Sequence, residues 1–142
     1  MFEKILIANR GEIAVRIIRA CKELDIKSVA IHSNVDNDAM HVRLADESIC
    51  VGSALPNNSY LNIPNIISAI EITGSDAVHP GYGFLSESDK FADILTKHDV
   101  KFIGPSSKSI LELGNKSNAL KLANKHGLPI LGNKNAKNID TT

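Results

Sequence analysis

The strongest candidate for binding a phosphate group is Lys116, which follows Asn115 at the start of a predicted helix. The backbone N–H groups at a helix start carry partial positive charge, so a lysine in the first turn is mildly unfavourable. A bound anion reverses the sign of that effect, because the lysine and the N–H groups then attract the same ligand. The alternative is an ordinary solvated lysine, which general burial statistics favour when the residue is considered alone.

A second candidate is the segment 79–87, which reads HPGYGFLSE. Gly81 and Gly83 permit backbone angles that other residues avoid, and they let a ligand approach the backbone closely. Taken alone, the pattern favours a tight turn after a strand, so a structural role and a binding role both stay open. Glu87 is consistent with a first-turn helix charge, and we assign it no chemistry.

The residue types argue against several other kinds of site. Asn9, Arg10 and Gly11 occupy the first strand-to-helix turn, but one glycine does not make the three-glycine fingerprint of dinucleotide-binding proteins. We interpret this turn as structural, with Arg10 available to bridge to another domain. The five histidines lack metal-ligand spacing, so we predict no metal site. No serine lies in a nucleophile-elbow pattern.

The elements that must position these residues follow from the apolar periodicity. Short apolar runs predict five buried strands, at 5–8, 28–31, 48–51, 76–78 and 101–103. Amphipathic stretches lie between them, and this alternation predicts an α/β domain: a Rossmann-like parallel sheet of about five strands with helices on both faces. Ligands in such folds meet the loops at the carboxyl ends of the strands, here 9–11, 32–38 and 79–87.

Helical spacing predicts the segments that connect the strands. The first helix is predicted from an apolar stripe of Ile13, Ile17, Cys21 and Leu24. A short helix is predicted at 40–44, and the next one ends at Gly74. Ser86 is the predicted N-cap of the following helix. Two short helices complete the pattern, one ending at Gly114 and the other at Gly127.

Composition narrows the class of protein. The 142 residues suit one domain, and 16 basic residues balance 16 acidic ones, which gives no attraction for nucleic acid or an anionic membrane. No apolar run is long enough to span a membrane, and the first residues do not resemble a signal peptide. Two cysteines are too few for a disulfide framework, so we expect a cytoplasmic location.

Four motifs carry a family resemblance. They are IANRGEIA at 7–14, RACKEL at 19–24, HPGYGFLSE at 79–87 and FIGP at 102–105. In this order they resemble the start of biotin carboxylases, and the resemblance extends from Glu3 to about Gly132. It implies an N-terminal, pre-ATP-grasp domain at 1–114, the start of the ATP-grasp region at 115–131, and a polar linker at 132–142 where the chain is cut short.

The resemblance also implies an activity. Members of the family are ATP-dependent ligases that use ATP, Mg²⁺ and bicarbonate to carboxylate biotin on a biotin carboxyl carrier protein, in concert with a carboxyltransferase component. Their magnesium-binding carboxylates, glycine-rich lid and bicarbonate-binding arginine come later than the matched segment. We therefore expect no catalytic residue in this chain and no activity from it alone. The acyl acceptor, such as acetyl-CoA, propionyl-CoA or pyruvate, stays open.

Specific residues acquire roles by the same resemblance. Lys116 corresponds to a lysine that contacts the ATP phosphates. Tyr82 and Gly83 correspond to the pocket for the biotin ring, and a tyrosine offers a flat apolar face plus one hydroxyl for such a ligand.

The resemblance also implies a homodimer. The outer side of the first helix is the expected contact, with Arg16, Arg19 and Glu23, although Arg19 and Glu23 are four residues apart and a local ion pair explains them equally well. The alternative reading of the whole chain is a stand-alone, non-catalytic binding or dimerisation module associated with a carboxylase.

Overall fold

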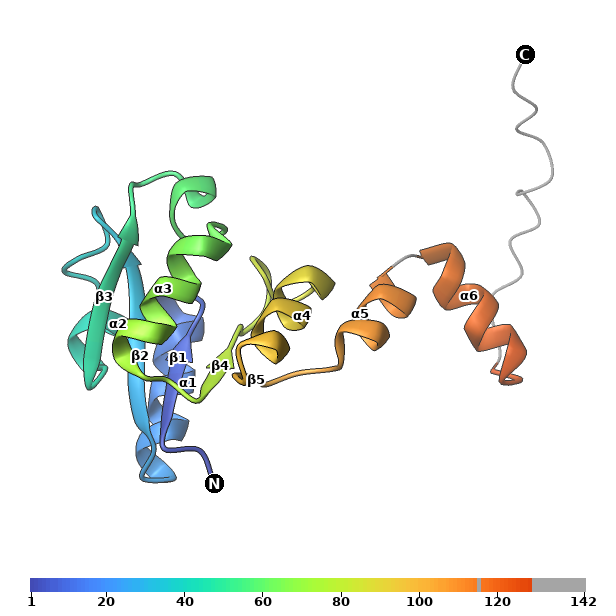
Figure 1. The fold of residues 1–142 in the computed structure, drawn as a ribbon, viewed down its shortest axis with the longest axis horizontal. Helices are drawn as coiled ribbons and strands as arrows, with labels where there is room; N and C mark the ends of the chain where they lie inside the picture. The colour runs from blue at the N-terminus through green and yellow to red at the C-terminus, as the bar shows by residue number, and fades with distance from the viewer. Residues whose placement is uncertain (115, 129–142) are drawn as a thin grey trace, which may run out of the picture.

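A computed structural model describes residues 1–114 and 116–128, and it is built on one parallel sheet (Figure 1). The five strands have the order β3-β2-β1-β4-β5, and all neighbouring pairs are parallel. Their bounds are β1 Lys4–Ile7, β2 Lys27–Ser33, β3 Glu47–Gly52, β4 Ala77–His79 and β5 Lys101–Phe102. The predicted Rossmann-like parallel sheet of about five strands is confirmed.

Helices connect the strands and continue after the last one. They are α1 Gly11–Glu23, α2 Met40–Leu44, the short 3-10 helix η1 Pro56–Asn58, α3 Ile63–Thr73, α4 Asp89–Lys97, α5 Ser107–Gly114 and α6 Lys116–Lys125. Gly74 ends α3 with a positive φ of 63°, as the sequence predicted. No helix among the described residues is long and apolar enough to cross a membrane.

The core consists of two apolar layers, one on each face of the sheet. Strand β1 shows the division most clearly, because its successive side chains point to opposite faces. Ile5 and Ile7 pack with α1, while Leu6 and the following Ala8 pack with α3 and α4. A central parallel strand that is covered on both faces must be apolar at every position, which explains the unbroken run in the sequence.

The buried face of α1 differs from the predicted stripe. Ala14, Ile18 and Cys21 are buried against the sheet, whereas Ile13 and Ile17 are only partly buried and Leu24 is 62% exposed. Both sets have helical spacing, and periodicity alone does not decide which of two adjacent stripes faces the core. Leu24 also lies just beyond the last helical residue.

The N-cap of α4 corrects a second prediction. Ser88, not Ser86, caps this helix, and its Oγ accepts a hydrogen bond from the Phe91 N–H at 3.2 Å. The Ser86 N–H instead donates to the carbonyl of Gly83, so Ser86 lies in the turn that precedes α4.

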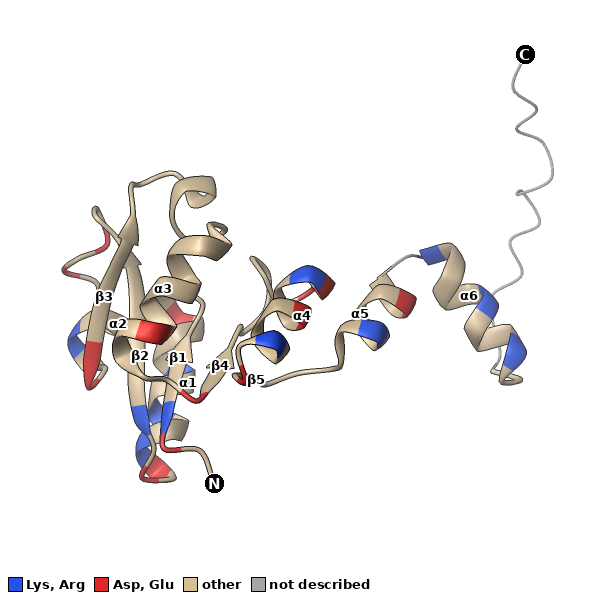
Figure 2. Ribbon diagram, viewed as in Figure 1, with Lys and Arg blue, Asp and Glu red and all other residues tan. Residues whose placement is uncertain are grey.

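The last two helices progressively leave the sheet. Helix α5 remains attached through Ile110, whereas α6 buries none of its residues and lies well away from the strands (Figure 1). The coloured positions on its ribbon are lysines, and residues 116–125 include no acidic residue (Figure 2). The predicted linker at 132–142 lies outside the described residues, and the division at 114/115 stays a prediction.

Candidate functional site

The strand order indicates a candidate ligand site at the carboxyl ends of β1 and β4. From β1 the chain proceeds outward through β2 and β3, then returns to add β4 and β5 on the other side. The loops after β1 and β4 therefore leave the sheet in opposite directions at adjacent points, which is where open α/β sheets bind ligands. This arrangement brings together residues 9–11 and 79–87, two of the three loops expected from the sequence.

Asn9 joins these two loops. Its side chain is 1% exposed, and its amide Nδ2 donates to the carbonyls of Pro80 at 2.8 Å and Tyr82 at 2.9 Å. Its Oδ1 accepts from the N–H of Arg10 at 2.9 Å. One buried side chain thus fixes the start of one loop against the backbone of the other.

The loop after β4 has an unusual backbone. Gly81, Gly83 and Phe84 all have positive φ angles, of 64°, 70° and 43°. At Gly81 a side chain is also excluded by space, because a Cβ would lie 2.7 Å from Ile13 Cγ2 and 2.8 Å from Asn9 Nδ2. The glycine therefore serves both conformation and close approach.

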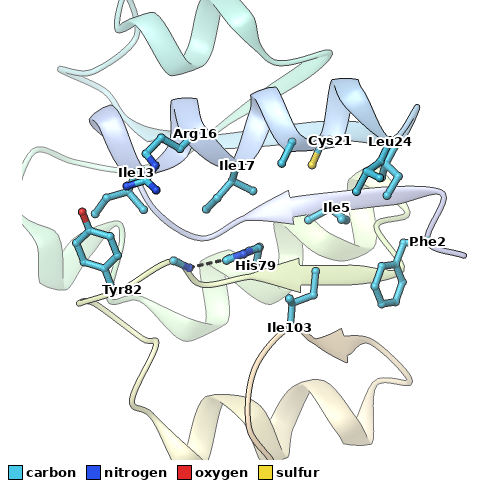
Figure 3. A pocket seen from close by; sticks show the side chains of 13 residues that line it. Phe2, Ile5, Ile13, Arg16, Ile17, Cys21, Leu24, His79, Tyr82 and Ile103 are labelled. Atoms are coloured by element: carbon cyan, nitrogen blue, oxygen red, sulfur yellow. Dashed lines mark hydrogen bonds between the residues drawn. The ribbon is translucent and has the colours of Figure 1, made fainter.

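Tyr82 lies at one end of a cavity that runs beside α1. The cavity has a volume of about 540 Å³ and is lined mainly by apolar side chains, with Phe2 at the opposite end (Figure 3). The Tyr82 side chain is 60% exposed. Ile13 and Ile17 of α1, which are only partly buried, and Leu24, which follows the helix, line this cavity.

His79, the last residue of β4, forms a hydrogen bond to the same loop. Its Nδ1 accepts a hydrogen bond from the Gly81 N–H at 3.0 Å, drawn as a dashed line in Figure 3. Burial lowers the pKa of His79, so the ring is neutral at pH 7 and Nδ1 keeps the lone pair that this bond requires. The proton of the neutral ring is then on Nε2.

A polar cluster connects the third loop, 32–38, to the same edge. The Oδ2 of Asp36 accepts from the Tyr60 hydroxyl at 2.6 Å, the Ser33 hydroxyl at 2.8 Å and Arg10 at 3.3 Å. These hydrogen bonds lower the pKa of Asp36, and the bond from Tyr60 has the largest effect. Burial and the adjacent carboxylate raise the pKa of Tyr60 to about 12. The guanidinium of Arg10 also lies 5.5 Å from the centre of the Tyr60 ring.

The candidate residues from the sequence occupy three separate places. Tyr82 and Gly83 lie in the loop at the sheet edge, and Arg16 on α1 also lines the cavity. Arg19 and Glu23 are exposed on α1, where the ion pair found is Arg16–Glu12 at 3.8 Å rather than Arg19–Glu23. Lys116 is exposed as the first residue of α6, and no residue of that helix lines the cavity.

Sequence reasoning missed three residues that organise the site: Asn9, Asp36 and Tyr60. The sequence predicts a structural turn at Asn9 but not the link from its side chain to the second loop. The one available signal was its position directly after a buried strand, where a polar side chain needs a partner. Asp36 lies within a loop that was singled out, but nothing in the sequence pairs it with Tyr60.

The candidate site combines an apolar cavity with loops whose backbone is held by hydrogen bonds. Within the described ranges, no three His, Cys, Asp or Glu side chains gather closely enough to hold a metal ion. The geometry fits one wall of a ligand site, with polar loops and an apolar cavity.

Fold and strand order define an α/β domain with a parallel sheet, whose candidate ligand site lies at the carboxyl ends of β1 and β4. Comparison with known proteins identifies it more closely. Residues 1–110 match the family described as "Biotin carboxylase, N-terminal domain". The chain therefore belongs to the biotin carboxylase N-terminal domain family.

Individual relatives support this assignment. The chain is 57% identical over 129 residues to the biotin carboxylase of Haemophilus influenzae, which covers 91% of this chain and 29% of that protein. A Campylobacter jejuni biotin carboxylase in complex with a β,γ-ATP compound has a TM-score of 0.90 at 47% identity, covering 93% and 30% of the two chains.

A third relative is the biotin carboxylase domain dimer of the 2-oxoglutarate carboxylase from Hydrogenobacter thermophilus, solved with MgADP, ADP and bicarbonate. It has a TM-score of 0.88 at 44% identity and covers 92% and 29% of the two chains. In each case the chain spans less than a third of the relative's length.

Proposed function

We propose that this chain is the N-terminal domain of a biotin carboxylase, which uses ATP and bicarbonate to carboxylate biotin held on a biotin carboxyl carrier protein. The observation that carries the proposal is the family match over residues 1–110, which includes both loops that meet at the sheet edge. A carboxyltransferase component would consume the carboxylated biotin, and the acyl acceptor is left open. The expected location is the cytoplasm.

The chemistry requires a closed, two-sided site. Bicarbonate is a poor electrophile, and ATP activates it by forming a mixed carboxylic-phosphoric anhydride with release of ADP. Such an anhydride hydrolyses readily, so water must be excluded while its carbon is transferred. Under this proposal the described residues form one side of that enclosure, and they contain no cluster of three His, Cys, Asp or Glu side chains that could hold a metal ion. We therefore infer that the domain binds and orients, and that another part of the enzyme performs the reaction.

The loops at the carboxyl ends of β1 and β4 fit the part of the proposed site that would bind biotin. Tyr82 presents a largely exposed aromatic ring on a loop whose backbone is held in place by Asn9 and His79. A fused ring with a ureido group needs such a flat apolar contact together with a few fixed polar groups. We propose that Tyr82 and Gly83 line the pocket for the biotin ring.

The start of α6 fits the part of the proposed site that would bind ATP. Lys116 is exposed at the first position of α6, and the first turn of that helix contains no acidic residue. We propose that Lys116 contacts the ATP phosphates once the rest of the ATP-binding region surrounds it. ATP would bring Mg²⁺ to neutralise the phosphate charge, and we propose that the ligands of this ion come from outside the described residues.

We also propose that the outer side of α1 contributes to a homodimer. Arg16, Arg19 and Glu23 are exposed there in neighbouring turns. Residues of both signs on one helix face suit a contact between two identical surfaces, in which each cation meets the partner's anion.

Paired substitutions in the complete enzyme test this assignment of binding roles. We expect Tyr82→Ala to raise the KM for biotin by roughly fivefold, the effect of about 1 kcal/mol from a lost aromatic contact, and to leave the KM for ATP unchanged. We expect Lys116→Ala to do the reverse, because removal of one phosphate contact weakens ATP binding alone.

Each variant serves as the control for the other, and Lys125→Ala, at the far end of α6, controls for the general loss of a positive charge. Unchanged KM values for both substrates in the two variants would contradict the assignment.

A further inference from the structure

The position of Tyr82 is fixed through its backbone rather than through its side chain. The ring is 60% exposed, so little packing holds it directly. The loop that carries it contains Gly81 and Gly83, which adopt positive φ readily, and Phe84, whose φ of 43° is uncommon for a residue with a side chain. The position of the ring therefore depends on the contacts that hold the loop backbone in place.

Asn9 is the residue placed to do this. It reaches across from the end of β1 and donates to two carbonyls of the loop, those of Pro80 and Tyr82, which flank Gly81. These two bonds use both amide hydrogens of a side chain that is almost completely buried. Gly81 lies so close to the amide that a Cβ there would be 2.8 Å from Nδ2.

We propose that Asn9 is a positioning residue for the biotin pocket: its amide holds the Pro80–Tyr82 backbone so that the Tyr82 ring faces the bound ligand. This inference rests on the proposed function, because it assumes that Tyr82 contacts biotin. Asn9 itself touches no substrate and acts only through the loop. Aspartate at this position has the same shape but offers oxygens to two carbonyl oxygens, so it cannot replace the amide.

The test uses the complete enzyme of which, under the proposed function, this chain is the front domain. Asn9→Ala and Asn9→Asp are compared with Asn65→Ala, in which another side-chain amide loses its bond to a backbone carbonyl, that of Val51 at 2.9 Å. We expect both Asn9 variants to raise the KM for biotin by about tenfold, because two carbonyls lose their donors and the loop is released. The KM for ATP should stay within about twofold, and Asn65→Ala should change neither KM.

A double variant separates positioning from general weakening. If Asn9 acts through Tyr82, Asn9→Ala combined with Tyr82→Ala raises the KM for biotin by less than the product of the two single effects. A fully multiplicative effect would overturn the proposal. So would an unchanged KM for biotin in the Asn9 variants when Tyr82→Ala raises it, and this outcome leaves the proposed function intact.

Two further results would also reject the positioning role of Asn9. If Tyr82→Ala leaves the KM for biotin unchanged, the biotin contact itself is wrong and the role of Asn9 falls with it. If neither Asn9 variant folds, as judged by thermal unfolding beside Asn65→Ala, Asn9 is a folding residue and the positioning role is rejected.

Discussion

At the residue scale, the site depends on polar side chains that are satisfied across long sequence separations. Asn9 bonds to carbonyls 71 and 73 residues away, and Asp36 accepts from Tyr60, 24 residues further along the chain. Apolar periodicity cannot predict such pairs, because it reports which face of an element is buried and nothing about the partner of a polar group. Tyr82 and Gly83 were assigned to the biotin pocket by the family resemblance, because the glycine pattern of their loop alone favours a tight turn. Their binding role stays a prediction.

The Asp36 cluster makes stability depend on pH in a specific direction. The pKa of Asp36 is lowered from 3.8, so its ionised form stabilises the fold above about pH 4, and this contribution is lost as the pH falls through the lower, folded-state value. We expect Asp36→Asn to lose about 1–3 kcal/mol of stability at pH 7, because hydrogen bonds to a carboxylate are replaced by weaker ones.

Thermal unfolding as a function of pH checks this. The difference in Tm between the chain and Asp36→Asn should shrink below pH 4, whereas Asp93→Asn, which removes an exposed surface ion pair, should change Tm little at any pH. A Tm difference for Asp36→Asn that is constant from pH 7 to pH 3 would contradict the account.

At the element scale, the sequence determines most of the architecture. Apolar runs located all five strands, and Gly74 located the end of α3. The failures have local physical causes. Helix α1 carries two adjacent apolar stripes, one that packs on the sheet and one, with Ile13 and Ile17, that lines the cavity. Ser86 and Ser88 are both acceptable N-caps by residue type, and the tight turn after Gly83 decides between them.

The capping residue of α4 can be tested directly. We expect Ser88→Ala to destabilise the chain by about 1 kcal/mol, since the N–H of Phe91 loses its acceptor. This corresponds to a decrease in Tm of roughly 2–4 °C for a domain of this size. Ser86→Ala is the matched control and should lower Tm by less. Equal effects of the two substitutions would show that the helix begins earlier than the structure indicates.

At the scale of the whole molecule, we propose that the domain supplies binding surfaces and that the chemistry takes place in other parts of an enzyme. Tyr82 and Lys116 lie on different elements, and no α6 residue lines the cavity beside Tyr82. The chain covers 29% of the Haemophilus influenzae protein, so most of the relative's length has no counterpart here. A site formed jointly with additional polypeptide accounts for both observations.

The proposed dimer contact is also a property of the whole molecule. We expect Arg19→Glu to shift the complete enzyme from dimer toward monomer. Across a two-fold interface, the new negative charge would face the negative charge of Glu23 or the same substituted residue on the other subunit. Sedimentation equilibrium measures this directly. Lys97→Glu, on the exposed side of α4, is the matched charge reversal and should leave the association unchanged. A complete enzyme that is monomeric at micromolar concentration would exclude the contact.

The most direct test of the central claim replaces the 129 matching residues of the Haemophilus influenzae biotin carboxylase with those of this chain. The measurement is ADP release that depends on both biotin and bicarbonate. We predict that the chimaera releases ADP in this way and that the 142-residue chain alone does not. A folded chimaera without activity, or turnover of free biotin by the chain alone, would contradict the account.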